Sequence, residues 1–181
     1  MVGSEREPTR VLVLYDSQGL VAELAASIVA GAASVEGVEV WDRPLAAANK
    51  QELVQCDAII LGSPNWTGIT GRLKHWWDYT GDLWESGELA GKPGAAFSAG
   101  WSPSGGLEAT LLQLVHLLIG HGMLIVGLPW TSTMNHSGSY YGATAVRKVT
   151  DLDRSQAEQL GARVARYAAS LREMREPEAD A

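Results

Sequence analysis

Four short runs of apolar residues, none of which alternates with polar residues, are the feature that most restricts the fold of this chain. They occupy positions 11–15, 58–61, 94–97 and 123–126. Uninterrupted apolar runs of this length are typical of strands buried on both faces of a parallel sheet. A fifth run, at 38–42, alternates between apolar and polar residues. This pattern predicts an edge strand with one face in water.

Between these runs, apolar residues recur every three or four positions, as they do on the buried side of a helix. The clearest stretches are 20–32, 107–118 and 157–171, and Ser155 with Glu158 resembles a capping box at the start of the last helix. Alternating strands and helices predict a doubly wound α/β fold with three layers. We expect a five-stranded parallel sheet of order 2-1-3-4-5, one domain over 10–172, and flexible ends at 1–9 and 173–181.

The composition excludes several partners. The 181 residues carry 14 Lys and Arg against 21 Asp and Glu, a net charge of −7, without a basic cluster. This balance argues against nucleic acid and anionic membranes as partners. There is no apolar stretch long enough to span a membrane, and no apolar segment of the secretory type follows Met1. With Cys56 as the single cysteine, we expect a cytoplasmic protein without an internal disulfide.

Three loops are the expected ligand site, because ligands of such sheets lie beyond the carboxyl ends of the strands. They are 16–20, 62–71 and 98–108, all rich in Gly, Ser, Asn or Thr. The first leads into a helix N-terminus, which can hold a phosphate. The others offer backbone amides and the indoles of Trp66 and Trp101 to a flat ring. Tight turns alone also produce such loops, but three at one sheet edge favour a flavin site. The candidate cofactor-binding residues are Ser17, Gln18, Gly19, Leu20, Val21, Pro64, Asn65, Trp66, Thr67, Gly68, Ser98, Ala99, Gly100, Trp101, Gly105 and Gly106.

Two further segments carry a family resemblance. They are Gly-Asp-Leu-Trp at 81–84 and Tyr-Gly-Ala-Thr at 141–144. Together with Ile-Ile-Leu-Gly-Ser-Pro at 59–64 and His-Gly-Met at 121–123, they resemble the WrbA-type branch of the flavodoxin family over about residues 10–172. The resemblance implies a flavodoxin-like fold, an FMN cofactor, NAD(P)H:quinone oxidoreductase activity, and a homodimer or homotetramer.

The implied mechanism is ping-pong, in which NAD(P)H passes a hydride to flavin N5 and a quinone then takes two electrons. The resemblance makes Trp84 a substrate-facing residue supplied by a neighbouring subunit. Tyr141 and His136, in the Gly-rich segment expected to follow the last strand, are candidates to border the same cavity. A plain exposed loop histidine is the alternative for His136. We nominate no catalytic acid or base, and the histidines show no metal-ligand spacing with carboxylates. Adjacent indoles at Trp76 and Trp77 cannot both face inward, which predicts a subunit contact there.

The loop at 17–21 departs from the family, because it is one residue short and keeps a single hydroxyl. Each hydrogen bond to a charged group is worth about 1.5–3 kcal/mol. Losing two would weaken FMN binding on the order of 10²–10⁴-fold. Asp16 would also repel the phosphate unless its side chain points back along the strand. The alternative function is therefore a flavodoxin-like protein with weak or absent FMN binding, either an electron shuttle, for which a charge of −7 suits a basic partner, or a repurposed binding or pathway protein.

Overall fold

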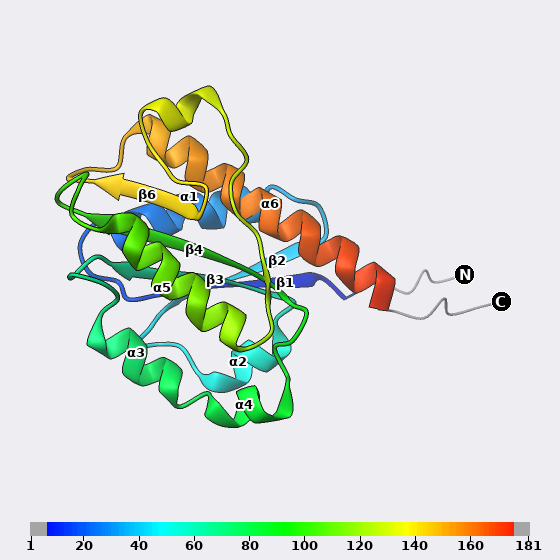
Figure 1. The fold of residues 1–181 in the computed structure, drawn as a ribbon. Helices are drawn as coiled ribbons and strands as arrows, with labels where there is room; N and C mark the ends of the chain where they lie inside the picture. The colour runs from blue at the N-terminus through cyan, green and yellow to red at the C-terminus, as the bar shows by residue number, and fades with distance from the viewer. Residues whose placement is uncertain (1–6, 176–181) are drawn as a thin grey trace.

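A single parallel sheet of six strands lies at the centre of the computed structural model, which describes residues 7–175 (Figure 1). The sheet runs in the order β2-β1-β3-β4-β5, and β6 also pairs with β4. This order confirms the predicted fold class, with one strand more than the sequence indicated. The strands are β1 (Thr9–Tyr15), β2 (Val38–Pro44), β3 (Ala58–Pro64), β4 (Pro93–Gly100), β5 (Leu124–Ile125) and β6 (Gly142–Val146).

Helices cover both faces of the sheet and produce the predicted three layers. In Figure 1, α1 and α6 lie above the sheet and α2, α3 and α4 lie below it. Alternate side chains of β1 pack on opposite faces of the sheet. Val11 and Val13 pack with α1 and α6. Leu12 and Leu14 pack with α3 and α5. The helices are α1 (Val21–Ala33), α2 (Lys50–Gln55), α3 (Gly71–Asp78), α4 (Gly81–Ser86), α5 (Leu107–Gly120), the short 3₁₀ helix η1 (Ser132–Asn135) and α6 (Asp151–Arg175).

The fifth position of the sheet is shared by two strands. The run at 123–126 was expected to form a whole strand, but only the two residues of β5 do so, opposite Pro93 and Gly94 of β4. The chain then leaves the sheet and returns as β6, which pairs with the other end of β4 from Ala96 to Gly100. The expectation that His136 and Tyr141 follow the last strand is therefore wrong, because β6 begins after them at Gly142. A Cβ atom at Gly142 would lie 1.9 Å from the Ala96 carbonyl oxygen, so only glycine allows this approach.

The last helix begins earlier than the capping-box pattern predicted. Thr150 caps α6, since the Asp153 N–H donates to the Thr150 hydroxyl at 3.3 Å and the Thr150 N–H donates to the Asp153 carboxylate at 2.7 Å. Ser155 lies inside the helix, so the predicted cap there is wrong. Secondary structure runs from Thr9 to Arg175, and the terminal segments 1–6 and 176–181 that were expected to be flexible lie outside the described residues.

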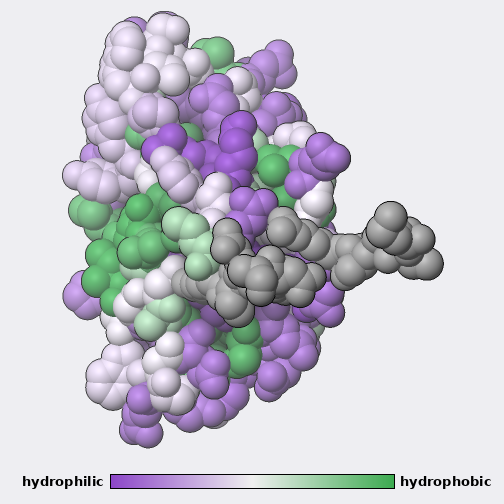
Figure 2. Space-filling view, turned by 90° about the vertical axis from the view of Figure 1, so that its right-hand side faces the viewer, coloured by the Kyte–Doolittle hydropathy of each residue, from purple (hydrophilic) through white to green (hydrophobic). Residues whose placement is uncertain are grey.

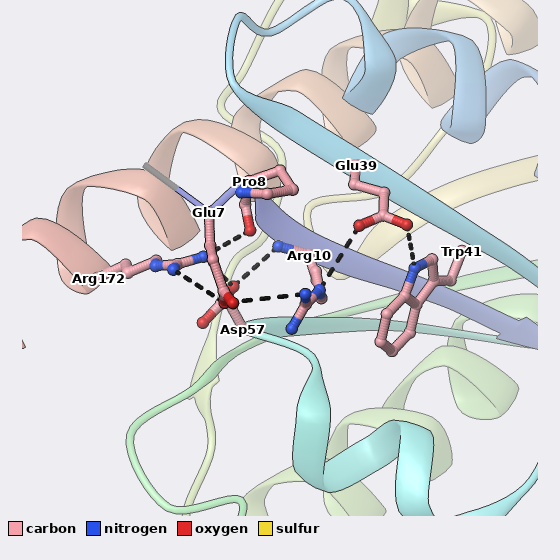
Figure 3. A network of polar contacts seen from close by, with 7 residues as sticks. All are labelled: Glu7, Pro8, Arg10, Glu39, Trp41, Asp57 and Arg172. Atoms are coloured by element: carbon pink, nitrogen blue, oxygen red, sulfur yellow. Dashed lines mark hydrogen bonds and ion pairs between the residues drawn. The ribbon is translucent and has the colours of Figure 1, made fainter. Parts of the chain in front are cut away.

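A polar network ties the start of β1 to the end of α6 (Figure 3). The Arg10 N–H donates to the Asp57 carboxylate at 2.8 Å, and Arg172 lies 3.5 Å from the same carboxylate while it also donates to the Pro8 carbonyl. On the other side, the guanidinium of Arg10 faces Glu39 of β2 at 3.5 Å. These contacts lie at the amino ends of the strands, away from the loops expected to bind a ligand, so they serve the fold.

Figure 2 shows the face of the molecule that lies on the right in Figure 1. This face is mostly polar, and an apolar area lies on the left side of Figure 2. Ile119 near the end of α5 and Leu124 on β5 are 56% and 50% exposed. Of the two adjacent indoles on α3, Trp77 is buried and Trp76 is half-buried. Within residues 7–175, none of the helices combines the length and apolar character needed to cross a membrane.

Candidate functional site

The carboxyl ends of β1, β3 and β4 meet at one edge of the sheet, where the loops after them enclose a cleft of about 440 Å³. This volume lies within the range of about 300–1,000 Å³ usual for small-molecule sites. All the residues that line the cleft are among those nominated from the sequence. They are Gln18, Gly19, Leu20, Pro64, Asn65, Trp66, Ala99, Gly100 and Trp101.

Two of the other nominated residues are buried and do not line the cleft. Val21 belongs to the core beneath α1, and Ser98 is fully buried with its hydroxyl donating to the Ser63 carbonyl at 2.8 Å. Ser17, Thr67, Gly68, Gly105 and Gly106 do not line the cleft, although they belong to the same three loops. They therefore shape the loops around the cleft.

The first loop ends at a helix N-terminus that no side chain of residues 7–175 caps. Gln18 donates its N–H back to the Asp16 carbonyl at 2.9 Å, and Gly19 follows with a φ of +59°, a conformation that glycine adopts readily. The chain then turns directly into α1. Uncapped N–H groups and the helix dipole together favour an anionic group at this position.

Asn65 holds the second and third loops together. Its side-chain amide donates to the Gly105 carbonyl at 2.6 Å, and its side-chain oxygen accepts from the Gly68 N–H at 3.2 Å and the Thr110 hydroxyl at 3.1 Å. Gln113 of α5 extends this support by accepting the Ile69 N–H at 2.9 Å. The sequence analysis did not identify Thr110 and Gln113 as residues that support the loops. The only indication in the sequence is that each is a polar residue within an apolar helix. Asn65 is thus mainly a residue that positions the loops.

Two indoles border the cleft and lie largely in solvent. Trp66 is 69% exposed and Trp101 is 77% exposed, which is unusual for such large apolar side chains. Arg147, just after β6, donates from its Nε to the Trp101 carbonyl at 3.1 Å and so fastens the third loop. This support also escaped the sequence analysis. Exposed indoles beside a cleft are suited to stacking on a flat ring.

Asp16 does not line the cleft. Its buried carboxylate accepts the Thr70 hydroxyl at 2.8 Å, and it forms an ion pair with Arg72 at the start of α3. The side chain is thus directed to the start of α3, where Arg72 pairs with its charge.

The three substrate-facing candidates lie elsewhere. Trp84 is 59% exposed on α4, and Tyr141 is 41% exposed just before β6. His136 lines a separate cavity of about 580 Å³ together with Glu108 and Asp153. A single chain therefore does not bring any of these three to the cleft. Among residues 7–175, no group of three or more His, Cys, Asp or Glu side chains is arranged to hold a metal ion.

The sheet order and the cleft at the carboxyl ends of its strands define a flavodoxin-type nucleotide-binding fold. Comparisons agree with this class. The profile of the family described as NADPH-dependent FMN reductase matches residues 33–136. A WrbA-like flavodoxin of Agrobacterium tumefaciens superimposes with a TM-score of 0.70 at 25% identity, over 89% of this chain and 97% of that one. An archaeal flavodoxin at 22% identity has a TM-score of 0.68 over 88% of this chain and 99% of its own, and supports the fold alone.

Two relatives in sequence are both named NAD(P)H dehydrogenase (quinone). That of Rhizobium rhizogenes is 33% identical over 196 aligned positions, which cover 90% of this chain and 98% of the relative. That of Archaeoglobus fulgidus is 44% identical over 125 residues, which span 68% of this chain and 65% of the relative. The chain belongs to the NADPH-dependent FMN reductase family.

Proposed function

We propose that this chain is an FMN-dependent NAD(P)H:quinone oxidoreductase. The observation that carries the proposal is the cleft enclosed by the three loops, which combines an uncapped helix N-terminus with two exposed indoles. An anionic group at one end and a flat ring at the other are the two parts of FMN. The names of the relatives and the family membership support the same activity.

The residues of the cleft suit the two parts of the cofactor. The backbone N–H groups at Gly19 and Leu20, with the first turn of α1, would hold the phosphate. Trp66 and Trp101 would flank the ring system, while Asn65 keeps their loops in place. FMN held by these residues would supply the hydride and two-electron transfer between NAD(P)H and a quinone. The chain itself would bind the ring and orient it.

Steady-state kinetics test this function. The purified protein, saturated with FMN, is assayed for oxidation of NADH and of NADPH with a soluble benzoquinone as acceptor. Parallel lines in double-reciprocal plots are expected for a ping-pong reaction. In a separate FMN titration, Trp101→Ala should raise the Kd for FMN, whereas Trp41→Ala, on β2 beside Glu39, should not. Failure of the FMN-saturated protein to oxidise either nucleotide would contradict the proposal.

We also propose that the protein is a cytoplasmic homodimer or homotetramer. Ile119, Leu124 and Trp84 are large apolar side chains that are at least half exposed, and association would bury such side chains. A subunit contact could bring Trp84 of one copy to the cleft of another. Light scattering on the wild type and on Ile119→Ser tests this, and a monomeric mass for the wild type would contradict it.

A further inference from the structure

The first loop begins with a negative charge where a phosphate would need a positive or neutral surrounding. Asp16 immediately precedes Ser17, and the Asp16 carbonyl accepts the N–H of Gln18 within the loop. A carboxylate so close to a bound phosphate would repel it, because like charges in a partly buried site are weakly screened. The loop also offers few side-chain hydroxyls to offset such repulsion.

Arg72 removes this conflict. Its Nη2 lies 2.7 Å from Asp16 Oδ1 and its Nε lies 3.3 Å from Oδ2, so both carboxylate oxygens are engaged by one guanidinium. The Thr70 hydroxyl donates to Oδ2 as well. The Asp16 side chain is 4% exposed, whereas that of Arg72 is 62% exposed. The carboxylate is thus buried against the start of α3 and its charge is paired there, and neither Asp16 nor Arg72 lines the cleft.

We propose that Arg72 is a specificity-determining residue that, by neutralising Asp16, allows the loop at 17–21 to accept the phosphate of FMN. The inference rests on the proposed function, since it concerns how this chain binds the same cofactor. The planar, two-pronged contact of Arg72 both cancels the charge of Asp16 and fixes its direction. Arg72 acts through Asp16 and is therefore a positioning residue.

A purely structural role for this ion pair makes a different prediction. If Arg72 only held α3 in place, its loss would weaken every ligand of the cleft by the same factor. If it neutralises Asp16, its loss would weaken only ligands that carry a phosphate. Riboflavin has the same ring as FMN and lacks the phosphate, so the ratio of the two dissociation constants separates the two roles.

The test is a titration of the apoprotein with FMN and with riboflavin, followed by quenching of flavin fluorescence. Arg72→Gln should raise the Kd of FMN at least tenfold and change that of riboflavin less than twofold. Arg72→Lys, which keeps the charge, should retain most of the preference for FMN. Lys74→Gln is the matched control, because it removes a cation from the same helix where Lys74 pairs with Asp78. It should leave both constants unchanged.

The double variant Asp16→Asn, Arg72→Gln decides the mechanism, because it removes both charges. Its Kd for FMN should return to within about threefold of the wild-type value. An equal loss of FMN and riboflavin binding in Arg72→Gln, an unchanged Kd, or no recovery in the double variant would each overturn the inference. A wild-type protein that binds neither flavin would instead contradict the proposed function itself.

Discussion

The rings of Trp77 and His121 meet edge to face in the layer beneath the sheet, with their centroids 5.2 Å apart. His121 Nε2 lies 3.1 Å from the Thr80 hydroxyl, and that hydroxyl donates its own proton to the Trp77 carbonyl at 2.7 Å. The Thr80 oxygen is therefore the acceptor, and Nε2 carries the proton of the neutral ring. Nδ1 is buried and has no partner among the described residues.

This environment makes the stability of the protein depend on pH. Burial lowers the pKa of His121 below its usual 6.5, so the unfolded chain takes up a proton at a higher pH than the folded one. The contribution of His121 is present above about pH 6.5 and is lost as the pH falls through the folded pKa, with a slope of at most about 1.4 kcal/mol per pH unit. Denaturant unfolding between pH 5 and 8 should show this loss in the wild type.

His121→Gln should flatten that part of the pH dependence. His75→Gln is the control, because His75 is exposed on α3. If the free energies of unfolding of the wild type and of His121→Gln change in parallel from pH 8 to pH 5, His121 is not the source of this pH dependence.

Gly142 should tolerate no side chain. Its φ is +157°, and an added Cβ would lie 1.9 Å from the Ala96 carbonyl oxygen. Gly142→Ala must push β6 away from β4, at a cost of about 3 kcal/mol or more in the free energy of unfolding. Gly120→Ala, where no atom would lie within 4 Å of the new Cβ, should stay within about 1 kcal/mol of wild type. Chemical denaturation compares the two variants, and equal effects would contradict the close approach of β6 to β4.

Cys56 should be unreactive in the folded protein. The thiol is 2% exposed, and burial raises its pKa to about 12. At pH 8 only about one thiol in 10⁴ is ionised, and the thiolate is the reactive form. An aromatic disulfide reagent at pH 8 should label Cys56 within minutes in guanidinium chloride and not within hours in buffer. Rapid labelling in buffer would show that the end of α2 opens readily.

Thr150 and Ser155 distinguish the observed start of α6 from the one expected from the sequence. Thr150→Ala removes the hydroxyl that accepts the Asp153 N–H, and should lower the free energy of unfolding by about 1 kcal/mol. Ser155→Ala replaces a residue inside the helix and should leave stability unchanged or slightly raised. Thermal unfolding of the two variants measures both effects. A larger loss for Ser155→Ala would place the cap where the sequence pattern put it.

The sequence was sufficient for most of the sheet because its central strands are buried on both faces. Runs such as 58–61 have no polar residue to mistake for a turn. The strand β6 gave no such signal, since it is made mainly of small residues and depends on the fit of Gly142 against Ala96. Its position depends on contacts between distant parts of the chain, which no local pattern encodes.

The same distinction applies to the cleft. Its lining residues follow from topology, because the ends of neighbouring parallel strands must meet at one edge. The contacts that fix the loops of the cleft do not follow from topology, because they join residues far apart in the sequence. Asp16 and Arg72 are 56 positions apart, and Asn65 and Gly105 are 40 apart. Trp84, His136 and Tyr141 were nominated as substrate-facing residues, and a role for them at the cleft stays a prediction that needs a second copy of the chain.

Titration of the purified apoprotein with FMN tests the central claim most directly. We expect saturable binding of one FMN per chain, with quenching of flavin and tryptophan fluorescence because Trp66 and Trp101 border the cleft, and with a shift in the visible flavin band. The double variant Trp66→Ala, Trp101→Ala should lose most of the quenching while remaining folded. Absence of saturation at millimolar FMN would contradict the assignment of this cleft as a flavin site.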